Sequence, residues 1–150
     1  MSLFDSMQIS VSGLSAQRVR MDVIASNIAN VDTLETAQGG PYIRKRVRFE
    51  TTNPETGDIV RVSAFDDVLA NRAIGQGVRV SAIEEDPAAL ELVYDPDNPS
   101  ADEDGFVLRP DIDLVTEMTD MLSATRAYEA NITVLNALKS MAMTALDISR

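Results

Sequence analysis

The chain has 150 residues, with 13 Lys and Arg against 24 Asp and Glu, which gives a formal net charge of −11 at pH 7. This length suits one domain with its own hydrophobic core. Such an acidic chain lacks the basic face that nucleic acid requires. It also has no Cys and no His, which excludes thiol nucleophiles, zinc–thiolate sites and the usual general base of enzymes. Composition therefore argues against most enzymes and against nucleic-acid binding.

The sequence also shows neither a membrane-spanning segment nor a cleaved secretion signal. No apolar run approaches the length of a membrane-spanning helix. The first residues do not combine a basic segment with an apolar block, as a cleaved secretory signal would. We therefore expect neither direct membrane insertion nor a cleaved leader.

Gly and Pro are concentrated in the middle of the chain. Apart from Gly13, every Gly and Pro lies between Gly39 and Pro110, whereas all seven Met lie outside that interval. Turn-forming residues indicate short strands, and stretches without them favour helix. The expected fold class is α+β, with an N-terminal helix (1–32), a small β-rich middle domain (33–110) and a C-terminal helix (111–150).

The first and last segments both show heptad spacing. Apolar residues in them recur at alternating steps of 3 and 4, which is typical of helices that pack in coiled-coil fashion. In the first segment the apolar members are Phe4, Met7, Val11, Leu14, Met21 and Ile28. In the last they are Leu114, Met118, Met121, Tyr128, Ile132, Leu135 and Leu146. Two helices that bury only a narrow seam form a thin core, so we expect the helices to find their apolar partners in other chains. A closed helical hairpin within one chain is the alternative.

The middle segment predicts several strands. Alternating or β-rich runs occur at residues 42–49, 59–64, 78–83, 90–94 and 106–108. Residues 51–57 resemble a hairpin tip, and residues 65–71 fit either a helical turn or a loop. We therefore expect a small set of antiparallel strands.

The middle segment contains two charged clusters that could bind a ligand, one acidic and one basic. The loop at residues 95–105 begins like a calcium-binding loop, but Pro99 and Ser100 stand where that motif needs an oxygen ligand and Gly. A solvated turn is the better interpretation, and we expect no metal and no cofactor. The basic cluster from Arg44 to Arg48 lies in an acidic chain and is better suited to pairing with carboxylates than with phosphate.

Three ordered motifs resemble one protein family. Residues 12–33, with Ala25-Ser-Asn-Ile-Ala-Asn30 followed by Thr33, are similar to the N-terminal signature of bacterial flagellar rod and hook proteins. Residues 123–131 and 134–141 resemble the C-terminal helix of that axial family, and residues 93–107 are similar to those of a proximal rod member. The match covers nearly the whole chain and is weakest at residues 53–77.

The resemblance implies a structural, non-enzymatic subunit of the basal-body rod in the periplasm. It would polymerise through its terminal helices to form part of the proximal drive shaft. The implied partners are further copies of itself, other proximal rod proteins, the distal rod protein, the rod adaptor of the inner-membrane ring and the type III export apparatus. The predicted assembly interface is made of the heptad residues named above together with Asn27 and Asn30. A cytoplasmic coiled-coil adaptor is the alternative function.

Overall fold

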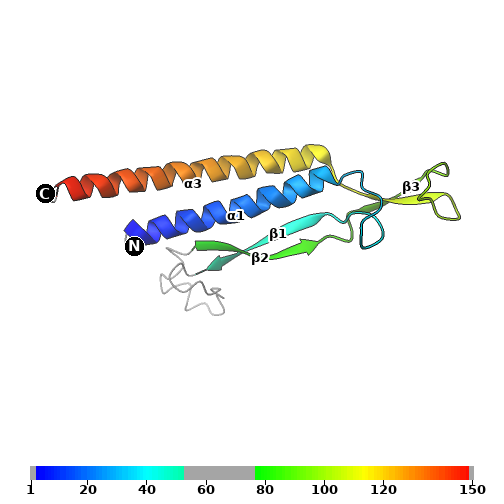
Figure 1. Cartoon of the computed structure of the whole chain (residues 1–150), viewed down its shortest axis with the longest axis horizontal. Helices are drawn as coiled ribbons and strands as arrows, with labels where there is room; N and C mark the ends of the chain where they lie inside the picture. Colours follow the sequence, from blue (N-terminus) through cyan, green and yellow to red (C-terminus); the bar gives the residue numbers. More distant parts are fainter. Residues whose placement is uncertain (1–2, 53–76, 149–150) are drawn as a thin grey trace, which may run out of the picture.

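The computed structural model describes residues 3–52 and 77–148. Helix α1 (Leu3–Ala29) is followed by strands β1 (Lys45–Thr52), β2 (Gly77–Glu85), β3 (Leu90–Tyr94) and β4 (Phe106–Pro110), and then by helix α3 (Leu114–Ile148). The molecule is elongated: α1 and α3 run antiparallel, and α1 lies between α3 and the β1–β2 sheet (Figure 1). The predicted α+β class is confirmed.

Helix α1 ends in a turn built by side chains. The Asn30 side-chain amide donates to the Ser26 carbonyl (2.8 Å), and the Thr33 hydroxyl donates to the Asn30 side-chain oxygen (3.2 Å). The Thr33 amide also donates to the Asn30 carbonyl (3.1 Å). Asn and Thr compete with helical hydrogen bonding in this way, and so they end helices and begin turns.

The beginning of α3 is set by a carboxylate cap. Asp113 Oδ1 accepts a hydrogen bond from the Val115 amide (3.0 Å), and Asp113 Oδ2 accepts one from the Thr116 hydroxyl (2.5 Å). These bonds, with that from Thr116 the more important, hold the pKa of Asp113 below its usual value. An Asp at this position satisfies amides that have no helical partner and faces the positive end of the helix dipole.

The two helices pack on each other within one chain, as in the closed helical hairpin that the sequence left as the alternative. The expected contacts with other chains stay a prediction. The seam on α3 that faces α1 repeats in steps of 4 and 3, and its members are buried or half-buried: Glu117, Met121, Ala124, Tyr128, Asn131, Leu135, Leu138 and Ala142. Three of these, Met121, Tyr128 and Leu135, are expected residues, whereas Glu117 and Asn131 lie one position before the expected Met118 and Ile132. Gly13 of α1 lets the helices approach closely here, because a Cβ on Gly13 would lie 3.2 Å from the Asn131 side chain.

The β1–β2 sheet covers the other side of α1. The strands are antiparallel, with Val47 opposite Ile83 and Phe49 opposite Val80, and a bulge leaves Ser81 as the extra residue. Strand β1 begins at Lys45, later than expected, because Tyr42 is instead buried against α1. The expected strand at 78–83 is confirmed as β2, whereas the features expected at 59–64 and 65–71 lie outside the described residues, as does most of the expected tip at 51–57.

The β3–β4 hairpin is a second, separate sheet. It confirms the strand expected at 90–94 and extends the one expected at 106–108 to Pro110. The hairpin projects beyond the end of the molecule where α1 stops and α3 starts (Figure 1). In its loop, Asp102 Oδ1 accepts hydrogen bonds from the amides of Asp104 (3.1 Å) and Phe106 (2.8 Å). Gly105 adopts a positive φ of 80°, which a side chain would disfavour.

Within the described part of the chain, neither helix combines the length and the apolarity needed to cross a bilayer.

We expect Gly77→Ala to destabilise the contact between α1 and β2. A Cβ at this position would lie 2.8 Å from the Ser12 hydroxyl, which accepts a hydrogen bond from the Val78 amide (3.1 Å). The free energy of unfolding should fall by about 1–3 kcal/mol in urea titrations, as for other overpacked sites. In the double variant S12A/G77A, removal of the hydroxyl should recover part of the loss, and an unchanged stability of the single variant would contradict this contact.

We expect Asp113→Ala to speed amide hydrogen exchange at Val115 and Thr116. The pKa of Asp113 is lowered in the folded chain, so the cap stabilises the helix start at pH values above the unfolded pKa. This contribution is lost as the pH falls through the folded pKa. Asp113→Asn is the control, because Asn also caps helices but does not titrate in this range. Equal protection in Asp113→Ala and the native chain at neutral pH would show that the cap contributes nothing.

Candidate functional site: a polar joint and exposed helix faces

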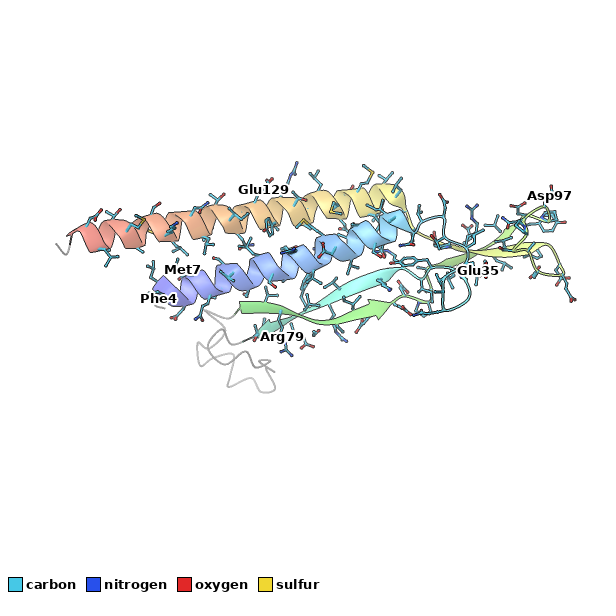
Figure 2. All side chains as sticks on the ribbon, in the orientation of Figure 1. Phe4, Met7, Glu35, Arg79, Asp97 and Glu129 are labelled. Carbon is cyan, nitrogen blue, oxygen red and sulfur yellow. The ribbon has the colours of Figure 1, made fainter. Side chains whose placement is uncertain are left out.

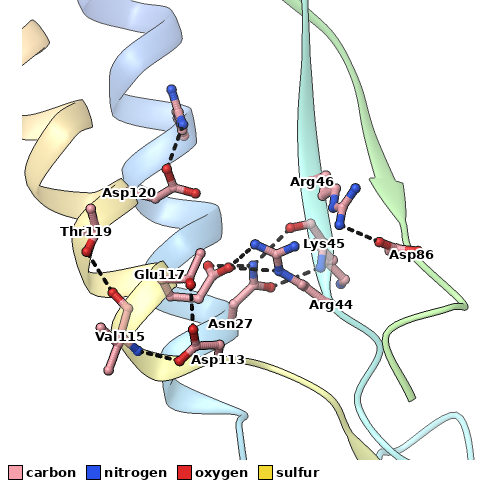
Figure 3. A network of polar contacts seen from close by, with 12 residues as sticks. Asn27, Arg44, Lys45, Arg46, Asp86, Asp113, Val115, Glu117, Thr119 and Asp120 are labelled. Atoms are coloured by element: carbon pink, nitrogen blue, oxygen red, sulfur yellow. Dashed lines mark hydrogen bonds and ion pairs between the residues drawn. The ribbon is translucent and has the colours of Figure 1, made fainter. Parts of the chain in front are cut away.

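Asn27 lies at the centre of a polar cluster that joins α1, α3 and β1 (Figure 3). Its side-chain oxygen accepts hydrogen bonds from the Tyr42 hydroxyl (3.0 Å) and the Lys45 amide (3.0 Å). Its side-chain amide donates to the Lys45 carbonyl (2.9 Å) and to Glu117 Oε2 (3.1 Å). All four hydrogen-bonding positions of the side chain are therefore used within one chain.

Glu117 is the charged member of this cluster. Its side chain is 1% exposed, and its Oε1 accepts hydrogen bonds from Nε of Arg44 (2.8 Å) and from Nη2 of the same guanidinium. The two-pronged contact neutralises a carboxylate that would otherwise be buried as an uncompensated charge. We call Asn27, Tyr42, Arg44, Lys45 and Glu117 the polar joint.

The joint lies where three elements meet, and it fixes how they are oriented. Asn27 comes from the last turn of α1, Glu117 from the first turn of α3, and the remaining members from the segment that enters β1. Hydrogen bonds restrict direction as well as distance, which apolar packing does not do. The β1–β2 sheet is thereby held at one angle to the helices.

The structure places the predicted assembly residues in three different environments. Those whose side chains are exposed are Phe4, Val11, Leu114, Met118, Ile132 and Leu146. Those that are half-buried are Met7, Leu14, Met21, Ile28, Asn30, Met121, Tyr128 and Leu135. Asn27 is 1% exposed, and its side-chain hydrogen bonds are made within its own chain. Asn30 likewise bonds within its own chain, in the turn after α1.

Sequence reasoning missed part of the exposed apolar surface of α3. Large apolar side chains outside the predicted seam are also exposed, namely Val115, Leu122, Val134, Met141 and Met143. Two of the intervals, Val115 to Leu122 and Val134 to Met141, are seven residues and were visible in the sequence, but a search for a single stripe finds only one face of a helix. α3 also extends past the start of α1 (Figure 1), and Met143 and Leu146 near its end are 59% and 69% exposed.

The described residues offer no arrangement of acidic side chains suited to a metal. Among residues 3–52 and 77–148, no three carboxylates gather closely enough to hold a metal ion. In the acidic loop, Asp95 and Asp102 make hydrogen bonds to neighbouring groups of the loop itself. These contacts are those of a turn.

Two family models match the chain. Residues 7–34 match the family described as "Flagella basal body rod protein", and residues 103–148 match "Flagellar basal body rod FlgEFG protein C-terminal". Among curated relatives, the flagellar basal-body rod protein FlgC of Borreliella burgdorferi is 48% identical over 99% of this chain and 98% of its own length. The FlgC proteins of Bacillus subtilis and Salmonella typhimurium are 42% and 39% identical, each over the full length of both chains. The chain belongs to the FlgC family.

Family membership confirms the function expected from the motifs. The chain is a structural subunit of the flagellar basal-body rod and is located there, and the alternative of a cytoplasmic adaptor is not favoured. The two regions matched by the family models supply opposite sides of the polar joint, because Asn27 lies in the first and Glu117 in the second. In this rod protein, the two helices matched by the family models and the joint between them therefore form one structural unit.

We expect Glu117→Ala to lower the free energy of unfolding by about 3 kcal/mol, because it leaves the Arg44 guanidinium and the Asn27 amide without their shared acceptor. Urea titration followed by circular dichroism measures the change. Glu129→Ala, on the exposed side of the same helix, should change stability by no more than about 0.5 kcal/mol. Equal losses in the two variants would mean that the joint is no more important than an ordinary surface position.

Proposed function

We propose that this rod subunit polymerises through the exposed apolar faces of α1 and α3, and that the polar joint passes torque from the helices to the sheet and the hairpin. The observation that carries the proposal is the number of large apolar side chains that the chain leaves exposed on its helices, including Phe4 (73%), Val115 (71%) and Leu146 (69%). When a neighbouring chain covers apolar side chains of this size, the removal of their surface from water stabilises the assembly.

The arrangement of the exposed residues supports contacts with more than one neighbour. On a helix of 3.6 residues per turn, Met118 and Val134 fall on opposite sides of the line along which α3 faces α1. Both are exposed, at 58% and 48%. One neighbouring helix cannot cover both flanks, so α3 suits a cylinder in which each helix has a neighbour on either side.

The energies suit assembly by many weak contacts. Full burial of a large apolar side chain contributes about 1.5–3 kcal/mol, and a side chain that is already half-covered contributes less. Several such residues on each helix would together offset the loss of translational freedom on joining a polymer. Met residues at positions 118, 141 and 143 are flexible enough to pack against neighbours that are not identical.

The proposal also includes the position in the rod and the partners that the family resemblance implies. The subunit takes part in the proximal section of the rod, crosses the periplasm as part of the drive shaft, and needs neither catalysis nor a cofactor. Its partners are copies of itself, other proximal rod proteins, the distal rod protein and the adaptor at the inner-membrane ring, after delivery by the type III export apparatus. The three-part division at residues 1–32, 33–110 and 111–150 belongs to this proposal, with the helices towards the axis and the middle part outside.

We expect Met118→Asp to abolish swimming while the purified chain stays folded. The side chain is 58% exposed in one chain, so a carboxylate costs little there until a neighbour covers it and removes its water. Motility in soft agar and electron microscopy of basal bodies measure assembly, and circular dichroism measures folding. Leu14 and Leu135 are less suitable sites because they are already half-buried within the chain.

The matched control for this experiment is Gln38→Asp, which adds the same charge to an exposed loop position. This variant should build rods and swim normally. If Met118→Asp also builds complete rods, the outer face of α3 is not an assembly surface and the proposed mode of polymerisation is wrong.

A further inference from the structure

One face of the β3–β4 hairpin is apolar and exposed. Leu92 and Leu108 lie opposite each other in the register, as do Tyr94 and Phe106, and residues directly opposite in a sheet share a face. The exposed fractions are 59% for Leu92, 65% for Tyr94 and 40% for Leu108. The Tyr94 and Phe106 rings pack edge to face with centroids 5.3 Å apart. This face of the hairpin is thus an ordered apolar surface that the chain's own helices leave exposed.

The same hairpin is strongly acidic. Six Asp and Glu lie between Glu91 and Asp104, and no Lys or Arg occurs from Val80 to Leu108. Two such hairpins would repel each other, since like charges in contact are destabilising. The partner of this face is therefore a different kind of surface, apolar and free of carboxylates.

A groove of that kind lies at the opposite end of the molecule. It runs between the first half of α1 and strand β2 and has a volume of about 680 Å³. Phe4, Val11 and Val80 are among its lining residues, none of the described lining residues is acidic, and Arg79 is the charged one. Phe4 and Val11 are 73% and 51% exposed. Figure 2 shows Phe4, Met7 and Arg79 near one end and Asp97 at the tip of the other.

We propose that the β3–β4 hairpin of one copy inserts its Leu92–Tyr94 face into the α1–β2 groove of a second copy. Apolar side chains would enter an apolar groove, and the acidic loop would meet a surface whose described lining residues include no carboxylate. Because the two surfaces are different and lie at opposite ends, the contact does not close on itself and adds copies along one direction. This deepens the proposed function, on which it rests, by adding an end-to-end contact to the lateral contacts of the helices.

Cross-linking of single-cysteine variants tests this contact directly. The native chain has no Cys, so a short bismaleimide joins only the introduced thiols. Leu92→Cys on a tagged full-length chain is mixed with Val11→Cys on an untagged one. We expect about tenfold more mixed dimer than from Leu92→Cys mixed with Ala137→Cys, an exposed position on α3, which corresponds to about 1.4 kcal/mol of preference.

A carboxylate placed in the groove provides the second arm. Adding Ser15→Asp to the Val11→Cys chain puts a negative charge among the groove residues and should reduce the mixed dimer several-fold, whereas Gln38→Asp should not. Cross-linking of Leu92→Cys mainly to itself, or no excess over the Ala137→Cys pair, would overturn the proposal. So would purified basal bodies in which Leu92→Cys is joined only to a different rod protein.

The helix-face mechanism and the end-to-end contact can fail separately. Met118→Asp lies on neither surface of the proposed contact, so a chain with this change should still form the mixed dimer in solution even when it builds no rods. Loss of the mixed dimer with intact rods would overturn the hairpin contact alone.

Discussion

The pairing of Glu117 with Arg44 and Asn27 is the interaction on which the arrangement of this rod subunit depends. A carboxylate that is 1% exposed must be matched by donors, and here the donors come from α1 and from the segment that enters β1. The charge can be satisfied only when all three elements take one relative position. The joint thus satisfies a buried charge by holding the three elements in one geometry, which suits the torque transmission that we propose for this subunit.

The chain divides its polar and apolar interactions between two purposes. Hydrogen bonds concentrate inside, at the joint and where Ser12 accepts from the Val78 amide. Large apolar side chains are left outside, along both helices and on the hairpin. The buried side chains still include apolar ones, such as Val23, Ile24 and Val107, as in an ordinary globular domain. The exposed apolar side chains suit the burial by neighbouring chains that we propose.

The structure shows which contacts the motif residues of the axial family make. Gly13 allows α1 to approach the Asn131 side chain of α3. The Asn27 side chain makes four hydrogen bonds, to Tyr42, Lys45 and Glu117, and Asn30 ends the helix. These residues serve contacts within one chain. The surfaces available to neighbours are made instead by residues whose only common feature is apolar character on an exposed helix face.

The sequence by itself determined the α+β class, both helices to within a few residues, most of the described strands and the family, because these depend on periodicity, on Gly and Pro positions and on local motifs. It did not determine which stripe of α3 faces α1. The stripes that contain Met118 and Ala124 have the same spacing and are offset by one residue. Only the packing of α3 on α1, with Gly13 close to the Asn131 side chain, distinguishes them. Nor did it pair Glu117 with Arg44, 73 residues apart, because the donors of a buried carboxylate are brought together by the tertiary fold alone.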